Sequence, residues 1–144
     1  AIPCIYGEDE EFEIGKAKCL KEGKDLTIMA NGDTVSIALE AAKKLEEEGI
    51  HAQVYDFHTI KPLDVDAVNK AIEENGKIIT VEDHNIINGL GSAVCEIVAE
   101  AGKGKVHRIG VQDQFGESAP YEELLKKNGI TSENIVKCAK DMID

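Results

Sequence analysis

The sequence predicts an α/β domain built on a mostly parallel β-sheet that is covered by helices on both faces. Short apolar runs rich in Ile and Val alternate along the chain with longer stretches in which apolar residues recur every three or four positions. Gly, Asn and Asp separate these two kinds of segment, as they do between strands and helices. Strands that alternate with helices in this way pair in parallel and are joined by right-handed crossovers.

Five segments in the first half of the chain follow this alternation. The expected elements, in order, are a short strand at 16–21, a strand at 25–30, a helix at 34–48, a strand at 52–57 and a helix after Pro62. Gly23 turns the chain after the first strand, Gly49 ends the first helix and Asn75-Gly76 ends the second. The residues expected on the buried faces of the two helices are Ile37, Ala38, Ala41 and Leu45, then Val65, Val68 and Ile72.

The second half continues the pattern. The β-branched run at 77–81 predicts a strand, and 105–111 predicts the last one. Between them a helix should begin near Gly89 or Gly91, with Leu90, Val94, Ile97 and Val98 facing inward. Two further helices are expected at 121–127 and 132–143, the second with Ser132 as its N-cap and with Ile135, Ala139 and Met142 on its buried side.

Composition and charge exclude several classes of protein. The 144 residues are 42% hydrophobic, which is enough for one core without metals or disulfides. The net charge of −12 argues against binding nucleic acid or an anionic membrane surface, since both need clustered cations. No apolar stretch approaches the roughly 20 residues of a membrane-spanning helix. Arg108 is the single arginine, so a complete sugar-phosphate pocket is not expected.

The four cysteines and the first residues complete this outline. Cys4, Cys19, Cys95 and Cys138 show neither C-x-x-C nor zinc-site spacing, which favours free thiols in a reducing cytoplasm. Residues 1–15 contain an acidic run at 8–13 and are interpreted as a linker, followed by one domain at 16–144. The chain begins Ala-Ile-Pro without Met, which we interpret as a fragment or a processed chain.

Four polar segments follow the predicted strands, where open parallel sheets bind ligands. They are Asn31-Gly32-Asp33, His58-Thr59, Glu82-Asp83-His84-Asn85 and Gln112-Asp113-Gln114. Polar residues here fit a ligand site, but any solvated loop edge shows them too. Adjacent residues at a strand end point in opposite directions, so His84, Glu82 and Asp83 are not expected to converge on a metal.

The segment Gly89-Leu90-Gly91-Ser92 matches part of a dinucleotide-binding fingerprint. Val94 stands where the third glycine would be, which favours the simpler interpretation that small residues let a helix start close to the sheet. A helix start can still attract an anion, so Gly89, Gly91 and Ser92 remain a candidate anion site. His51 and His107 are predicted to be surface residues, and Cys95 an inert buried thiol. From these residues alone, an enzyme and a binding module both remain open.

Longer stretches resemble the C-terminal domain of transketolase-like thiamine diphosphate enzymes, in order and across nearly the whole chain. They cover 12–50, VYDFHTIKPLD at 54–64, ITVEDHNIINGLGSAV at 79–94 and FGESAPYEELLKKNGIT at 115–131. The resemblance implies a three-layer α/β/α fold with a five-stranded mixed sheet whose first strand is antiparallel. It also implies a parent enzyme, a dimer, that moves a two-carbon ketol unit between sugar phosphates with thiamine diphosphate and Mg or Ca.

In that family the cofactor, its metal and the activating glutamate belong to the two preceding domains, which bind the diphosphate and the pyrimidine. Asn31-Gly32-Asp33 is not the family's G-D-G metal motif, and we carry over no catalytic, cofactor-binding or metal residue. The implied role is structural: the domain packs on the pyrimidine-binding domain or subunit and helps to form the homodimer. His84, Gly89, Gly91 and Ser92 are the candidates for that contact.

Several alternatives to this interpretation stay open. Deoxyxylulose-phosphate synthase and the beta subunit of 2-oxoacid dehydrogenases share the implied fold, although TIKPLD and FGES look nearest to transketolase, especially its form split into two subunits. An anion- or nucleotide-binding regulatory module is a second class, and a small stand-alone enzyme using His58 or His84 is a third. The leading prediction is an inactive isolated domain.

Overall fold

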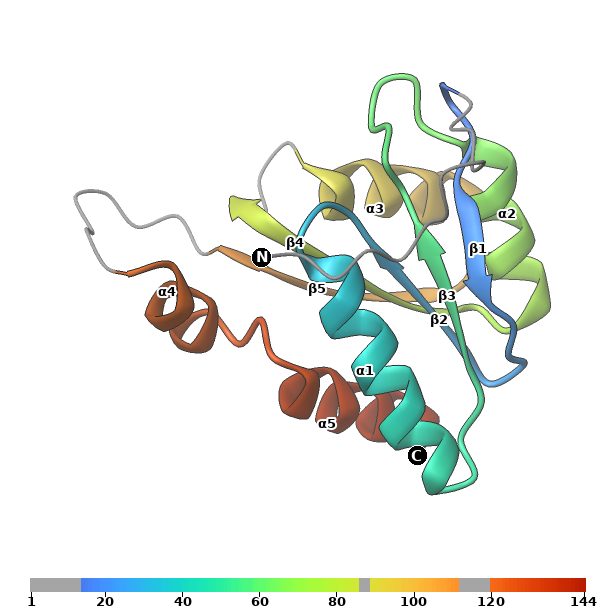
Figure 1. Cartoon of the computed structure of the whole chain (residues 1–144). Helices are drawn as coiled ribbons and strands as arrows, with labels where there is room; N and C mark the ends of the chain where they lie inside the picture. Colours follow the sequence, from blue (N-terminus) through green and yellow to red (C-terminus); the bar gives the residue numbers. More distant parts are fainter. Residues whose placement is uncertain (1–13, 86–88, 112–119) are drawn as a thin grey trace, which may run out of the picture.

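Five short segments of the sequence pair into one mixed sheet (Figure 1). The computed structural model describes residues 14–85, 89–111 and 120–144, with the backbone alone for 84 and 85. The strands are β1 (Lys18–Lys21), β2 (Leu26–Ala30), β3 (Ala52–Asp56), β4 (Lys77–Asn85) and β5 (Lys105–Val111). The helices are α1 (Thr34–Glu47), α2 (Val65–Glu74), α3 (Leu90–Ala101), α4 (Tyr121–Lys127) and α5 (Ser132–Ile143). None of the described helices combines the length and apolar character needed to cross a membrane.

The strand order is β1-β3-β2-β4-β5, and β1 alone runs against its neighbour. This confirms the predicted five-stranded sheet with an antiparallel first strand. Lys18, at the start of β1, pairs with Asp56, at the end of β3. The chain therefore enters the sheet at the edge where the four parallel strands end, which we call the carboxyl edge.

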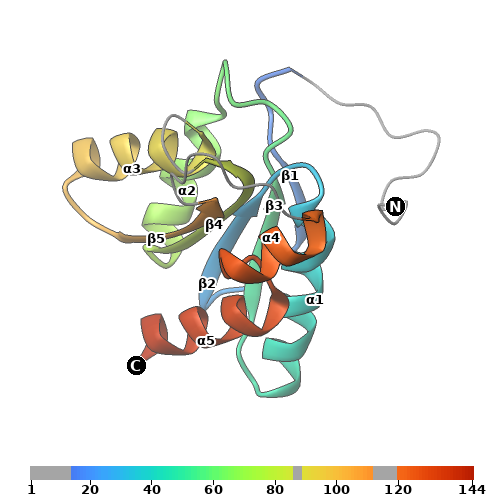
Figure 2. The ribbon, with the colours of Figure 1, turned by 90° about the vertical axis from the view of Figure 1, so that its left-hand side faces the viewer.

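Helices cover the two faces of the sheet as separate layers, with α1, α4 and α5 on one side and α2 and α3 on the other (Figure 2). The central strand β2 is buried throughout, because both of its faces are covered. Ile28 and Ala30 pack in the cluster beneath α1 and α5, whereas Met29 packs in the cluster beneath α2 and α3. The alternation of side chains along one strand thus supplies both halves of the core.

Three local predictions were wrong. The strand at 77–81 continues through 82–85, so Glu82 and Asp83 belong to β4 and not to a loop. Val65 is 47% exposed, because it opens α2 and the buried face of that helix is formed by later residues such as Val68. The N-cap of α5 is Thr131, whose hydroxyl accepts the Asn134 N–H at 3.1 Å, and Ser132 is the first helical residue.

Candidate functional site

The strand order reverses between β2 and β4, and open α/β sheets bind their ligands at such a switch point. From β2 the chain crosses over one face through α1, whereas from β4 it crosses over the opposite face through α3 (Figure 2). Asn31 and Asp33 follow β2, and Glu82 and Asp83 lie near the end of β4. Ala30 pairs with Val81, so the residues that follow these two on β2 and β4 lie side by side. The structure thus brings two of the four predicted segments to one place.

Glu82 points to the α3 face and is fully buried. Its Oε1 accepts the N–H of Leu90 and its Oε2 accepts the N–H of Gly91, both at 2.8 Å. These are N–H groups of the first helical turn, which have no partner within the helix. An internal carboxylate therefore stands where the anion-site hypothesis would place an external ligand.

Asp83 bonds to a helix on the opposite face of the sheet. Its Oδ2 lies 2.9 Å from the Tyr121 hydroxyl at the start of α4, and Asp33 Oδ2 lies 3.0 Å from the same hydroxyl. The prediction that adjacent residues at this strand end diverge is confirmed, because Glu82 bonds to α3 and Asp83 to α4. The Tyr121 hydroxyl links the segments that follow β2 and end β4, and α4 is anchored to both.

We expect Tyr121 to ionise at a higher pH than an ordinary tyrosine. Burial raises its pKa, and hydrogen bonding to the carboxylates of Asp83 and Asp33 raises it further. Because the folded pKa exceeds the unfolded one, the neutral phenol stabilises the fold below about pH 10, and this contribution is lost as the pH rises toward the folded pKa. Tyrosinate absorbance followed during alkaline titration measures this step as the difference between the native chain and Tyr121→Phe, because the other tyrosines ionise too and burial also raises the pKa of Tyr55. Asp83→Asn should shift it to lower pH and Tyr121→Phe should remove it; an unchanged titration in Asp83→Asn would contradict the assignment.

The glycines at the start of α3 let the helix approach the sheet closely, as the simpler sequence interpretation predicted. Gly89 is the N-cap, and Gly91 is buried. A Cβ on Gly91 would lie 2.9 Å from both Arg108 Cδ and Thr80 Oγ1. Gly91 therefore faces β4 and β5, while Ser92 is half-buried. His84 belongs to β4, but its side chain lies outside the described part of the structure.

Among the described residues, the remaining candidates add no converging set. His58 is half-buried just beyond β3, and 112–114 lie outside the described residues. Within 14–85, 89–111 and 120–144, no three side chains of His, Cys, Asp or Glu are placed to hold a metal ion. His51 and His107 are exposed, which confirms their prediction as surface residues.

The described cysteines Cys19, Cys95 and Cys138 are free thiols, and Cys4 lies outside the described residues. Burial raises the pKa of the Cys95 thiol, although the Arg108 guanidinium acts in the opposite direction. Sequence reasoning missed this neighbour, because Cys95 lies on α3 and Arg108 on β5, and only the packing of α3 on the sheet brings the two elements together. Cys95 is half-buried, not buried as predicted. The raised pKa still leaves less thiolate at neutral pH, which fits an inert thiol.

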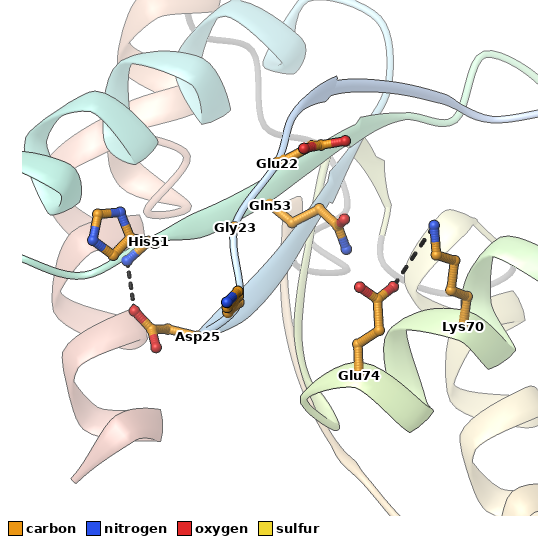
Figure 3. A pocket seen from close by; sticks show the side chains of 8 residues that line it. Glu22, Gly23, Asp25, His51, Gln53, Lys70 and Glu74 are labelled. Atoms are coloured by element: carbon orange, nitrogen blue, oxygen red, sulfur yellow. Dashed lines mark hydrogen bonds and ion pairs between the residues drawn. The ribbon is translucent and has the colours of Figure 1, made fainter.

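A cavity of about 600 Å³ lies at the opposite edge of the sheet, and sequence reasoning missed it (Figure 3). Its walls include Glu22, Asp25, His51, Gln53, Lys70 and Glu74. Asp25 Oδ2 accepts the backbone N–H of His51 at 2.7 Å, and Lys70 Nζ lies 4.0 Å from Glu74 Oε1. Gln53 Nε2 donates to Thr27 Oγ1 at 3.3 Å. Two of these contacts join wall residues to each other and the third joins the wall to β2, and we assign the cavity no ligand.

Comparison with known proteins agrees with this fold. The family model described as "Transketolase, C-terminal domain" matches residues 15–135. A "Putative transketolase C-terminal section" of Methanocaldococcus jannaschii is 47% identical over 136 residues, which are 92% of this chain and 42% of the relative. A "1-deoxy-D-xylulose-5-phosphate synthase" of Heliobacterium modesticaldum is 39% identical and is matched over 94% of this chain and 22% of its own length.

A solved structure titled "Split gene transketolase, inactive beta4 tetramer" superposes with a TM-score of 0.92 at 42% identity. It is matched over 99% of this chain and 46% of its own. The chain thus spans less than half the length of the relatives it matches. The resemblance seen in the sequence, the sheet order and the family match agree, and the chain belongs to the transketolase C-terminal domain family.

Proposed function

We propose that this chain is the non-catalytic C-terminal part of a transketolase-type enzyme. The parent transfers a two-carbon ketol unit between sugar phosphates in the pentose phosphate pathway, as a homodimer. Thiamine diphosphate and its Mg or Ca ion are held by the preceding diphosphate-binding and pyrimidine-binding domains or subunits. The free thiols fit a reducing cytoplasm as the location of the enzyme.

The observation that carries this proposal is how the residues at the switch point between β2 and β4 are hydrogen-bonded. A ligand there would use N–H groups at the start of α3 and polar side chains beyond β2 and β4. The N–H groups of Leu90 and Gly91 donate hydrogen bonds to Glu82. The carboxylates of Asp33 and Asp83 both lie within hydrogen-bond distance of the Tyr121 hydroxyl. Neither N–H group is therefore free for a diphosphate, which supports the proposal that the cofactor is held elsewhere in the parent enzyme.

The direction of β1 supports a docking role for the carboxyl edge. Ala17 N–H donates to Asp64 Oδ2 at 2.8 Å, which ties the residues just before β1 to the start of α2. Because β1 begins at the carboxyl edge, a chain arriving from a preceding domain would enter the sheet there. The candidates His84, Gly89, Gly91 and Ser92 belong to the segments that end β4 and start α3. We propose that this edge meets the pyrimidine-binding domain.

Complementation tests the proposal directly. The chain alone should show no ketol transfer and no saturable heat with thiamine diphosphate and Mg²⁺. Mixing it with the separately expressed remainder of the parent enzyme should restore turnover. Turnover by the chain alone, or saturable cofactor binding to it, would contradict the division of labour.

The second candidate parent is a deoxyxylulose-phosphate synthase. Identity is 47% to the transketolase section and 39% to the synthase, which favours transketolase. Reconstituted enzyme should therefore use a ketose phosphate donor, and use of pyruvate in its place would indicate the synthase. A 2-oxoacid dehydrogenase would also use a 2-oxoacid, but it would release no sugar phosphate.

A further inference from the structure

Glu82 is an acidic side chain in the interior of the domain. It is fully buried, and in the described part of the chain its hydrogen-bond partners are the two N–H groups at the start of α3. Burying a carboxylate is strongly unfavourable unless both oxygens are compensated. Each oxygen here receives one short N–H bond, and the positive end of the helix dipole lies at the same place.

The surroundings hold this arrangement in place. Gly91 leaves no room for a Cβ between the helix and the side chains of Arg108 and Thr80, so the helix start is pressed onto the sheet. Leu90, which donates to Glu82, is itself fully buried in the cluster shared by α2 and α3. The carboxylate and the packing thus fix the same two residues.

We propose that Glu82 is a positioning residue: an internal anion that fixes the start of α3 against the end of β4 at the carboxyl edge. Asp83, the next residue, ties the same strand end to Tyr121 on the other face. Two consecutive carboxylates of β4 therefore determine where both flanking helices begin. One step of the inference rests on the proposed function: the carboxyl edge is taken as the surface that contacts the neighbouring domain.

Amide hydrogen exchange tests whether Glu82 fixes the start of α3. In Glu82→Gln one amide oxygen can accept one N–H, while its NH₂ group faces the other donor. We expect the Leu90 or Gly91 amide to exchange at least about tenfold faster. Glu96→Gln, which changes an exposed glutamate of α3, is the matched control and should leave both rates unchanged. Unchanged exchange in Glu82→Gln would overturn the proposal.

Chemical rescue distinguishes a positioning anion from a residue that merely fills space. Glu82→Ala should lower the Tm by roughly 10 °C, because two buried N–H groups lose their acceptors. Sodium formate should raise the Tm of this variant saturably, because formate can occupy the vacated carboxylate position, and sodium chloride at equal ionic strength should not. Equal responses to formate in Glu82→Ala and in the native chain would overturn the proposal. If Glu82→Ala does not fold, the exchange measurement on Glu82→Gln decides.

Docking tests the step that rests on the proposed function. Binding of the chain to the remainder of the parent enzyme, followed by titration calorimetry, should weaken at least about tenfold in Glu82→Gln and remain unchanged in Glu96→Gln. Equal docking by the two variants would overturn the positioning of the edge. If the native chain itself does not dock, the proposed function fails instead, and exchange and rescue still decide the role of Glu82.

Discussion

Replacing Gly23 with alanine should lower the free energy of unfolding by about 3 kcal/mol or more. A Cβ at this position would lie 2.5 Å from the carbonyl carbon of Ala52 and 2.6 Å from the carbonyl oxygen of His51. Both atoms belong to backbone, so the clash cannot be relieved by rotating a side chain. Asp25 N–H donates to the His51 carbonyl at 2.9 Å, and Asp25 Oδ2 accepts the His51 N–H. The turn cannot withdraw from β3 without losing these bonds.

Gly102→Ala is the matched control for this substitution. Gly102 has φ of +73° with nothing within 4 Å of a new Cβ, so alanine there adds conformational strain without a clash. That strain should cost about 1–2 kcal/mol. Urea unfolding of both variants measures the difference. Equal losses would show that the turn before β2 moves freely, contrary to the contacts described above.

Phe57→Ala should lower the free energy of unfolding by about 3–5 kcal/mol. Phe57 is 1% exposed and is among the largest fully buried side chains. Its ring meets that of Tyr55 edge to face, with 6.1 Å between the centroids, in the cluster beneath α2 and α3. Alanine would leave a cavity in this cluster, because the backbone is held by the Phe57 N–H bond to Ala30 at 2.8 Å.

Phe57→Leu separates the cavity from a wider disturbance of the strand. Leucine keeps most of the apolar volume, so its loss should be less than half that of alanine. Urea unfolding monitored by circular dichroism gives both values. A loss below about 1 kcal/mol in Phe57→Ala would mean that the cluster collapses around the gap, against the close packing assigned to it.

The fold was accessible from the sequence because its signals are local. The run at 105–111 and the helices at 121–127 and 132–143 have their predicted bounds, since turn residues flank each one. Gly49, with φ of +83°, ends α1 where a residue tolerant of that conformation was expected. Thr131 was missed as the N-cap because Thr131 and Ser132 can both accept the bond, and only backbone geometry separates them.

The candidate site was less accessible, because its contacts join distant parts of the chain. The residue types of the segment at 82–85 indicate a polar loop. No neighbouring residue in the sequence indicates that Glu82 will be buried against the start of a helix eight residues later. Tyr121 meets Asp33 across 88 positions of sequence. The cavity walls likewise come from the β1–β2 turn, β3 and α2, which no spacing rule connects.

The reversed direction of β1 has a consequence for how such an enzyme can be divided into two chains. Because β1 begins at the carboxyl edge, a chain arriving from a preceding domain would enter the sheet at the edge where we propose the contact. A short connection then holds the two surfaces at a high effective concentration, about millimolar for short flexible linkers. Breaking the connection removes that advantage but alters no residue at the edge. Two separate chains can therefore assemble through the same surface, provided that their dissociation constant lies below their concentration in the cell.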